Sequence, residues 1–425
     1  MVKKFKDYVI EPIQDNWIVD RIGDLLLKEF SGTWGPENAD GINVLRSTNF
    51  QNNGYLNLDS VAVREIGENY PSEKIICFGD ILLERSGGGP QQPVGRVSWC
   101  DDRVVGWAFS NFCQLLRPSV KVDNKFLFFA LHYLHLRNIT LTYQNQTTGI
   151  RNLEYKSYLK IPIPLPPLPE QRKISEILSM VDDAIEKTDT IIQQTQQLKK
   201  GLMQKLFTEG IGHARFKETK IGRIPEEWEV VSIKDIGDVK GGKRLPKGEE
   251  FAERKTEYPY IRVIDFQNMS ICVEQLEYLT EEVQRAISRY TISCNDIYIS
   301  IAGTIGLVGT IPHHLDGANL TENAAKICNL NKVDKKFLAY YLSSFQAQRQ
   351  ISSFIGISTQ PKLALNRIEK IRLLLPDLDE QKNIAEILLK VDTNIENEQA
   401  YKAEIEHLKK GLMQVLLTGQ IRVKV

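Results

Sequence analysis

The sequence predicts an α+β protein in which two globular α/β domains are separated by two long helices that form an antiparallel coiled coil. The main observation is a 50-residue segment that occurs twice, at 161–210 and 371–420, with 23 identical positions and no gap. A duplication of this length organises the whole fold. We therefore expect domains at 1–160 and 211–370, helical segments at 161–210 and 371–425, and a pseudo-twofold relation between the halves.

The domains themselves repeat more weakly. Residues 45–52 resemble 261–268, and residues 79–83 resemble 295–299, both at an offset of 216. Short apolar runs such as 75–76 and 297–301 are typical of strands. Residues 125–136 and 335–342 are predicted to be helices. Each domain is thus expected to mix strands and helices on a common plan.

Each copy of the repeat predicts one long helix, because apolar residues recur every three or four positions and leave one apolar stripe. Pro169 suits a first helical turn, and Asp377 with Glu380 has capping-box spacing. No Pro or Gly interrupts either copy before Gly201 and Gly411. A narrow stripe about 55 Å long favours pairing with the other copy. The alternative is a pair of amphipathic helices that lie on a globular core.

Composition limits the class of protein. The chain has 425 residues, with no apolar stretch near the ~20 residues that a membrane helix needs and no signal peptide, so we expect a cytoplasmic protein. The six cysteines are scattered, which does not indicate a zinc site. Net charge is zero, from 54 basic and 54 acidic residues. Nucleic-acid binding would therefore require the basic residues to gather on one face.

Catalytic motifs are not apparent. The only Pro-Pro, at 166–167, leads into a helix and has no Asn or Asp before it, as a DNA amino-methyltransferase motif would. Residues 241–244, Gly-Gly-Lys-Arg, lack the spacing and the hydroxyl of a phosphate-binding loop. The carboxylates at 377 and 380 stand too close to form a nuclease metal site. We expect no catalytic residue, no metal and no enzyme activity in this chain.

Several motifs resemble the conserved regions of type I restriction–modification specificity subunits, in the order that this family has them. They are Ile-Pro-Ile-Pro-Leu-Pro-Pro-Leu-Pro-Glu-Gln at 161–171, Leu-Lys-Lys-Gly-Leu-Met-Gln at 198–204, Gly-Arg-Ile-Pro-Glu-Glu-Trp at 222–228 and Leu-Thr-Gly-Gln-Ile-Arg at 417–422. The resemblance covers the whole chain. The extreme N-terminus of the first domain matches less well, and the linker at 373–377 departs from the proline-rich pattern.

The resemblance implies a non-catalytic DNA-binding subunit. Each globular domain would be a target-recognition domain that reads one half of a bipartite duplex DNA target, while the helices fix the gap between the halves. Two methyltransferase subunits would dock on the helices, and two restriction–translocase subunits would complete the complex. S-adenosylmethionine, Mg and ATP are expected only in those partner subunits. The alternative is a coiled-coil adaptor that binds proteins and has no DNA specificity.

Candidate DNA contacts are side chains that bond base edges in two places or hold phosphates. They lie in the shared segment, the Gly-rich loops and a basic loop. The candidates are Arg46, Asn49, Gln51, Asn52, Arg85, Ser86, Gln91, Gln92, Arg96, Lys240, Lys243, Arg244, Arg262, Gln267, Asn268 and Thr304. The candidates for subunit docking are Lys199, Lys200, Lys409 and Lys410, in the two Leu-Lys-Lys-Gly segments.

Overall fold

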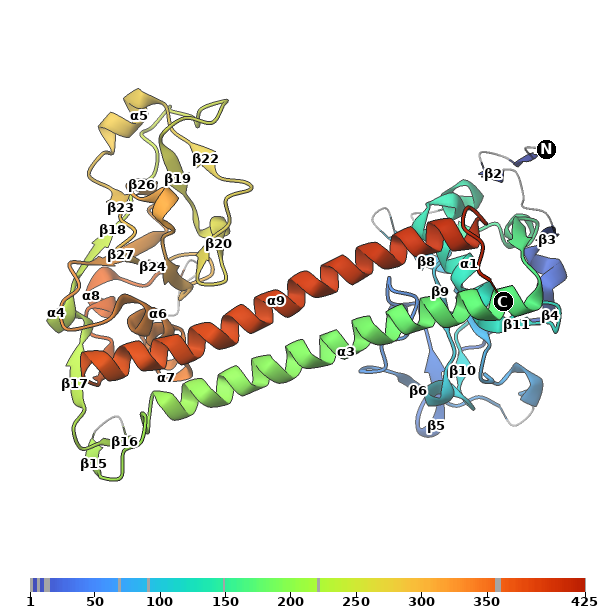
Figure 1. The fold of residues 1–425 in the computed structure, drawn as a ribbon, viewed down its shortest axis with the longest axis horizontal. Coiled ribbons are helices and arrows are strands. Elements are labelled where there is room, and N and C mark those ends of the chain that lie inside the picture. Colours follow the sequence, from blue (N-terminus) through green and yellow to red (C-terminus); the bar gives the residue numbers. More distant parts are fainter. Residues whose placement is uncertain are drawn as a thin grey trace. The chain divides into compact units, whose positions relative to one another are not determined.

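The repeated segments form two long helices, α3 (Leu168–Leu206) and α9 (Leu378–Leu417), of 39 and 40 residues (Figure 1). Each is about 60 Å long at 1.5 Å per residue. Both continue without a break through Gly201 and Gly411. The computed structural model describes residues 3–5, 8–10, 16–67, 70–89, 92–147, 150–219, 222–355 and 361–424.

The chain divides into two compact units, and the division falls within both long helices. Unit 1 comprises residues 1–189 and 400–425, and unit 2 comprises residues 190–399. Each unit therefore contains one globular domain, part of α3 and part of α9. The predicted boundaries at 160, 210 and 370 mark a different division, between the globular domains and the helices.

The globular part of unit 1 is built on a four-stranded antiparallel sheet in the order β4–β11–β7–β9, and α1 (Asn124–Leu136) packs against it. Smaller sheets have the orders β10–β5–β6, β12–β13–β8, β14–β3 and β1–β2. A short helix, α2 (Tyr155–Tyr158), precedes β14. The strands are β1 (Lys3–Phe5), β2 (Tyr8–Ile10), β3 (Ile18–Arg21), β4 (Leu26–Ser31), β5 (Glu37–Leu45), β6 (Ala62–Arg64), β7 (Ile81–Glu84), β8 (Ser86–Gly88), β9 (Val97–Trp99), β10 (Ala108–Phe109), β11 (Cys113–Pro118), β12 (Gln144–Thr147), β13 (Ile150–Leu153) and β14 (Pro162–Leu165).

Unit 2 repeats this plan with the four-stranded sheet β18–β27–β24–β25 and the sheets β22–β19–β26–β23, β17–β28, β20–β21 and β15–β16. Its strands are β15 (Phe216–Thr219), β16 (Gly222–Pro225), β17 (Glu229–Ser232), β18 (Asp238–Gly241), β19 (Pro259–Ile261), β20 (Phe266–Gln267), β21 (Ser270–Ile271), β22 (Glu277–Tyr278), β23 (Thr291–Ile292), β24 (Ile297–Ser300), β25 (Val308–Thr310), β26 (Ala318–Leu320), β27 (Ala324–Cys328) and β28 (Arg372–Leu375). Its shorter helices are α4 (Ile233–Ile236), α5 (Glu281–Ala286), α6 (Lys335–Ser343), α7 (Phe345–Phe354) and α8 (Leu365–Ile368).

The α+β prediction is confirmed, as are the helices at 125–136 and 335–342 and the strand at 297–301, observed as α1, α6 and β24. The strand expected at Ile75–Ile76 is wrong. Ile76 is buried, but it lies in an irregular segment whose backbone bonds to Gly106 and Trp107. Burial of a two-residue apolar run does not require a strand, and here the neighbouring loop supplies the backbone partners.

Both long helices complete the hydrophobic core of each unit. In unit 1 the core contains Ile174 and Leu178 from the start of α3, and Met413 and Leu416 from the end of α9. In unit 2 the roles reverse, with Leu206 from the end of α3, and Ile384 and Leu388 from the start of α9. The alternative of amphipathic helices on a globular core thus describes the helix ends.

Ion pairs show that α3 and α9 run antiparallel. In unit 1, Asp182 and Asp189 of α3 pair with Lys409 and Lys402 of α9, so positions that rise by seven in α3 fall by seven in α9. In unit 2, Lys199 of α3 pairs with Asp392 of α9. The seven-residue step is the heptad of a coiled coil. The predicted antiparallel pairing is confirmed within each unit.

The Glu-Gln pair at the start of each long helix fixes the helix to its domain. Gln171 accepts a hydrogen bond from the Asp123 amide N–H at 2.8 Å and donates to the Pro166 carbonyl at 2.8 Å. Gln381 makes the same two contacts, with Asp334 at 2.7 Å and Pro376 at 2.9 Å. Both glutamines are buried. The repeated motif therefore links the helix, the preceding strand and the domain helix.

The glutamates of the motif bind the chain that leaves the opposite helix. Glu170 accepts two hydrogen bonds from Arg422 at 2.8 and 2.7 Å. Glu380 accepts from the Ile211 amide at 2.8 Å and from Trp228 Nε1 at 2.9 Å, and lies 2.9 Å from His213 Nε2. These bonds correct half of the expected capping box. Asp377 caps the Glu380 amide at 2.8 Å, but the Glu380 carboxylate points to other partners.

Removal of the Lys409 charge is expected to destabilise unit 1. The Lys409 and Asp182 side chains are each only 9% exposed, so Lys409→Met leaves a buried carboxylate without its cation. The expected loss is about 3–5 kcal/mol in the free energy of unfolding. Lys402→Met is the matched control, because its pair with Asp189 is more exposed and should contribute about 1 kcal/mol or less. Urea denaturation of both variants measures the difference, and equal losses would contradict the prediction.

Candidate functional site

A tight turn in unit 2 displays two of the candidate DNA contacts. Gln267 and Asn268 are exposed at the turn between β20 and β21, where Asn268 and Met269 both have positive φ, 49° and 56°. Two consecutive residues in this conformation form a hairpin turn that matches the strand twist. The Met269 carbonyl accepts a hydrogen bond from the Thr310 amide of β25 at 2.9 Å, which fixes the turn to the central sheet. We call residues 267–270 amide turn 2.

Unit 1 displays Gln51 and Asn52 at the equivalent sequence positions, on a turn in which Gly54 has the positive φ, 90°. Both are exposed, in a turn closed by the Gln51 amide, which donates to the Tyr55 carbonyl at 3.0 Å. The Gly54 carbonyl accepts from the Trp99 amide of β9 at 3.0 Å, and β9 occupies the sheet position that β25 has in unit 2. We call residues 51–54 amide turn 1. Each unit thus presents a Gln-Asn pair, the side chains suited to the N6 and N7 atoms of adenine.

The other half of the shared segment is occupied within the fold. Asn49 is buried, accepts from the Arg46 amide at 3.0 Å and donates to the carbonyls of Asn57 and Ser60 at 2.9 Å. Asp265 holds the Arg262 amide likewise at 2.7 Å. The Arg262 guanidinium is also paired with Glu277 at 2.9 Å. These positions favour a structural explanation for this part of the repeat, while Arg46 is half-buried.

Arg96 is also a core residue. It is buried and forms a two-bond ion pair with the buried Glu84, at 2.8 Å for both bonds, and it donates to the Phe50 and Ser47 carbonyls. Desolvation raises the pKa of Glu84, although the Arg96 charge opposes this. The burial and the partners of Arg96 favour a structural role.

The Gly-rich segment that contains Arg85 and Ser86 forms β8, the edge strand of the sheet β12–β13–β8. Arg85 donates to Gln114 at 2.9 Å and lies over the Tyr155 ring, and the Ser86 hydroxyl bonds to Asn152. Gln92 is exposed, and Gln91 lies outside the described residues. Gln92 is therefore the member of this group that the structure leaves at the surface.

In unit 2 the basic loop at 240–247 is exposed. Lys243 and Arg244 lie at the surface, and Lys240 is paired loosely with Asp238 at 3.8 Å. Exposed cations of this kind suit phosphate contacts. Thr304 is exposed in the loop after β24, where its carbonyl accepts from the Ser300 hydroxyl at 2.6 Å.

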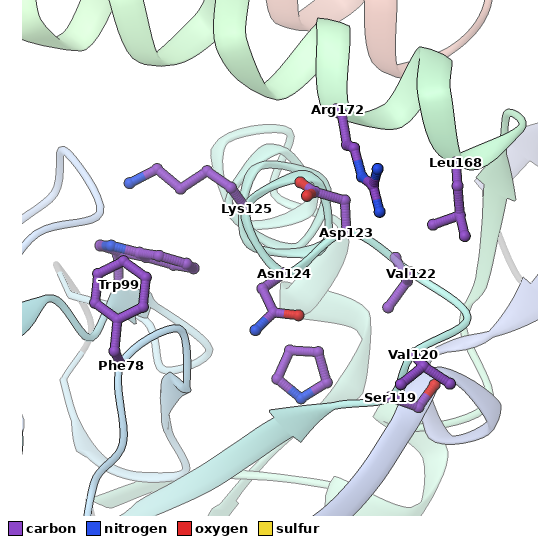
Figure 2. Close-up of a pocket in the computed structure, with 11 residues that line it drawn as sticks. Phe78, Trp99, Ser119, Val120, Val122, Asp123, Asn124, Lys125, Leu168 and Arg172 are labelled. Atoms are coloured by element: carbon purple, nitrogen blue, oxygen red, sulfur yellow. The ribbon is translucent and has the colours of Figure 1, made fainter.

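Unit 1 also has an open cavity of about 800 Å³ near the start of α1 (Figure 2). Phe78 and Trp99 meet edge to face at 5.8 Å on one side, and Arg172 of α3 approaches from another. The Lys125 ammonium lies 4.2 Å from the Trp99 ring centroid. Burial lowers the pKa of Lys125 to about 8, although the Asp182 carboxylate opposes this. The cavity combines an aromatic wall with cations.

The four lysines that the sequence suggested as docking candidates fall into two classes. Lys199 and Lys409 point into the helix pair, where they bind Asp392 and Asp182. Lys200 and Lys410 are exposed. Each unit also exposes two apolar side chains seven residues apart on one helix, Ile191 and Leu198 in unit 2 and their repeat equivalents Tyr401 and Leu408 in unit 1. We call these four residues the outer apolar positions.

Among the described residues, no group of three or more His, Cys, Asp or Glu side chains is placed to hold a metal. The same residues include no helix that is both long and apolar enough to cross a membrane. All six cysteines are free thiols.

Sequence reasoning missed two tyrosines that join the domains to the helices. Tyr55 and Tyr340 each donate a hydrogen bond at 2.7 Å to an aspartate of a long helix, Asp182 and Asp392 respectively. The aspartates are repeated in the sequence, as are the lysines that bind them. The tyrosines occupy unrelated positions in the two domains, so comparison of the repeats gives no signal for them.

Comparison with known proteins identifies a consistent set of relatives. A family model described as the type I restriction modification DNA specificity domain matches residues 14–197 and again 225–407. The MjaVIII type I restriction enzyme specificity subunit of Methanocaldococcus jannaschii is 31% identical over 99% of this chain and 97% of its own length.

Solved structures agree with this at the level of the fold. A chain from a study of the assembly and conformational transition of a type I restriction–modification system aligns over 97% of this chain with a TM-score of 0.60 and 15% identity. The S subunit of such a system from M. genitalium aligns over 98% with a TM-score of 0.56 and 17% identity.

Substitutions at Arg96 and Gln51 are expected to have different effects on the free energy of unfolding. Arg96→Met should lower the free energy of unfolding by about 3–5 kcal/mol, because it strands the buried Glu84 carboxylate. Gln51→Ala, at an exposed turn position, should change it by no more than about 0.5 kcal/mol. Thermal or urea melts of the two variants measure this contrast. If Arg96→Met is as stable as the parent, Arg96 is not the core residue described above.

Proposed function

Because this chain belongs to the type I restriction–modification DNA specificity family, we propose that its two globular domains read the two halves of a bipartite DNA target. The observation that supports this most is the pair of amide turns. Equivalent places in both units hold an exposed Gln-Asn pair on a turn fixed to the central sheet. A fixed turn loses little conformational freedom on binding, so its amides are preorganised for base edges.

Phosphate contacts would supply the rest of the affinity. The zero net charge requires locally exposed cations, and the basic loop with Lys243 and Arg244 provides them in unit 2. Such contacts carry no sequence information, but they position the reading side chains. Binding is therefore expected to weaken as salt rises. A coiled-coil adaptor without DNA specificity would lack this dependence.

The proposed role is non-catalytic. S-adenosylmethionine, Mg and ATP would be bound by partner subunits, two that transfer methyl groups and two that restrict and translocate DNA. The helix pair would hold the half-sites at a fixed gap. Helices of about 60 Å are long enough for half-sites one helical turn apart, about 34 Å.

Domain exchange tests the proposal. Residues 1–160 are replaced by the equivalent domain of a relative. Both helical segments are kept, so that Glu170 can still bind Arg422. Methylation mapping in cells that contain the methyltransferase partner is expected to show one half of the target changed and the other unchanged. The purified chain alone should transfer no methyl groups. A change in both halves, or methyl transfer by the chain alone, would contradict the proposal.

The docking surface is proposed to lie at the outer apolar positions and the repeated glycines. Gly201 and Gly411 are exposed inside long helices, and a Cβ there would meet no atom within 4 Å. Nothing within the described chain therefore requires glycine, which is less favourable than alanine in a helix. Their repetition beside Leu198 and Leu408 suggests that a partner helix approaches closely at both places. Two equivalent surfaces match two copies of one methyltransferase subunit.

Alanine at both Gly201 and Gly411 is expected to raise the stability of the chain and to weaken its binding to the methyltransferase subunit. Gly201→Ala with Gly411→Ala should raise the free energy of unfolding by roughly 1–2 kcal/mol in total, because helix propensity improves. The same variant should bind the methyltransferase subunit more weakly, as measured by titration calorimetry. Charge reversal at the exposed Lys200 and Lys410 tests the polar rim of this surface, while Lys402→Met serves as the control. Undiminished binding in the alanine variant would exclude close approach at the glycines.

A further inference from the structure

Each unit contains one cluster of three polar groups that joins the domain to both long helices. In unit 1, Tyr55 donates to Asp182 of α3 at 2.7 Å, and Lys409 of α9 binds the other carboxylate oxygen. In unit 2, Tyr340 donates to Asp392 of α9 at 2.7 Å, and Lys199 of α3 binds the other oxygen. We call these clusters the tyrosine joints.

The joint of unit 1 is the more enclosed of the two, because the Lys409 and Asp182 side chains are each 9% exposed. In unit 2, Tyr340 is 5% exposed, while the Lys199 and Asp392 side chains are 22% and 23% exposed. The lysine ammonium also lies over a domain ring in both units, 5.8 Å from the Phe129 centroid in unit 1 and 5.4 Å from the Tyr340 centroid in unit 2. Burial first, and the aspartate second, raise the pKa of both tyrosines, so each hydroxyl stays a donor.

Unit 1 connects its joint directly to the reading surface. Tyr55 follows amide turn 1, and its carbonyl accepts the hydrogen bond from the Gln51 amide that closes this turn. The same residue therefore holds the turn by its backbone and the helix by its hydroxyl. In unit 2 the connection passes through α6, which packs against β25, the strand that holds amide turn 2.

We propose that Tyr55 and Tyr340 are positioning residues that hold the amide turns on the helix pair, and thereby make the complex selective for one gap between half-sites. The inference rests on the proposed function, because a fixed gap matters only if both domains read DNA. A helix pair can set a distance only if the domains do not move on it. The joints supply that connection by hydrogen bonds to a buried or half-buried carboxylate, which are stronger than those between neutral groups.

Repetition supports this assignment. The aspartate and the lysine recur at an offset of 210, whereas the tyrosine comes from a loop in unit 1 and from α6 in unit 2. Packing alone would need no hydroxyl at either place. Two unrelated positions that provide the same donor to equivalent carboxylates point to a shared requirement for a firm joint.

The test removes only the hydroxyls. Tyr55→Phe, Tyr340→Phe and the double variant are each assembled with the methyltransferase partner. Methylation rates are measured on duplexes that carry the mapped target with its native gap and with one base pair added or removed. Lys402→Met is the control, because it breaks a contact between the helices that involves no domain side chain.

The double variant should keep its rate on the native gap within about threefold, while its preference for the native over the altered gaps falls by about tenfold. A merely structural effect would lower all rates together and leave the preference unchanged. If the parent complex is selective and the double variant is equally selective, the joints do not position the domains. If the parent complex itself shows no gap preference, the proposed function fails, and the joints fail with it.

Discussion

The structure depends on the burial of polar side chains where each long helix leaves its domain. The residues at these points are Glu170, Gln171, Glu380 and Gln381, and little of each side chain is exposed. A carboxylate that is removed from water needs hydrogen-bond or ionic partners. The partners of each glutamate lie just beyond the end of the opposite helix, at Arg422 in unit 1 and at Ile211 and His213 in unit 2. Neither domain is therefore complete without a segment of chain from the other repeat.

This constraint changes how the repeat is interpreted. Strong similarity between two helices suggests a shared external partner, but four of the repeated polar residues in each copy form contacts inside the protein. Glutamates, glutamines, aspartates and one lysine of each repeat hold the helices to the domains or to each other. The repeated positions left at the surface include the exposed glycines, the second lysine of each pair and the outer apolar positions. A partner surface is best sought there.

Sequence predicted the arrangement of the elements better than the use of the side chains. Periodicity and the duplication were enough for α3, α9, α1 and α6, because apolar spacing depends on local geometry. Side chains that serve tertiary contacts have no such signature. Arg96 is of a type that can bind guanine, yet it forms an ion pair with a buried glutamate. Lys409 was expected on a docking surface, yet it lies in a buried ion pair. The tyrosine joints could not be predicted from the duplication, because the aspartate and the lysine repeat but the tyrosine does not.

The differences between the units show which parts of the design are free to change. Glu170 pairs with Arg422 in unit 1, whereas the equivalent Glu380 pairs with His213 in unit 2. Asp80 pairs with Arg117, whereas Asp296 pairs with Lys326. In the joints, Tyr55 of unit 1 is replaced by Tyr340 of unit 2. The acidic residue is kept in each case, on a long helix for the first and third pairs and just before β7 or β24 for the second, while its partner varies. A fixed set of acidic groups can thus accept several kinds of donor. A domain that supplies any suitable donor can be joined to the same helices, so its reading surface can diverge while the helix pair stays constant.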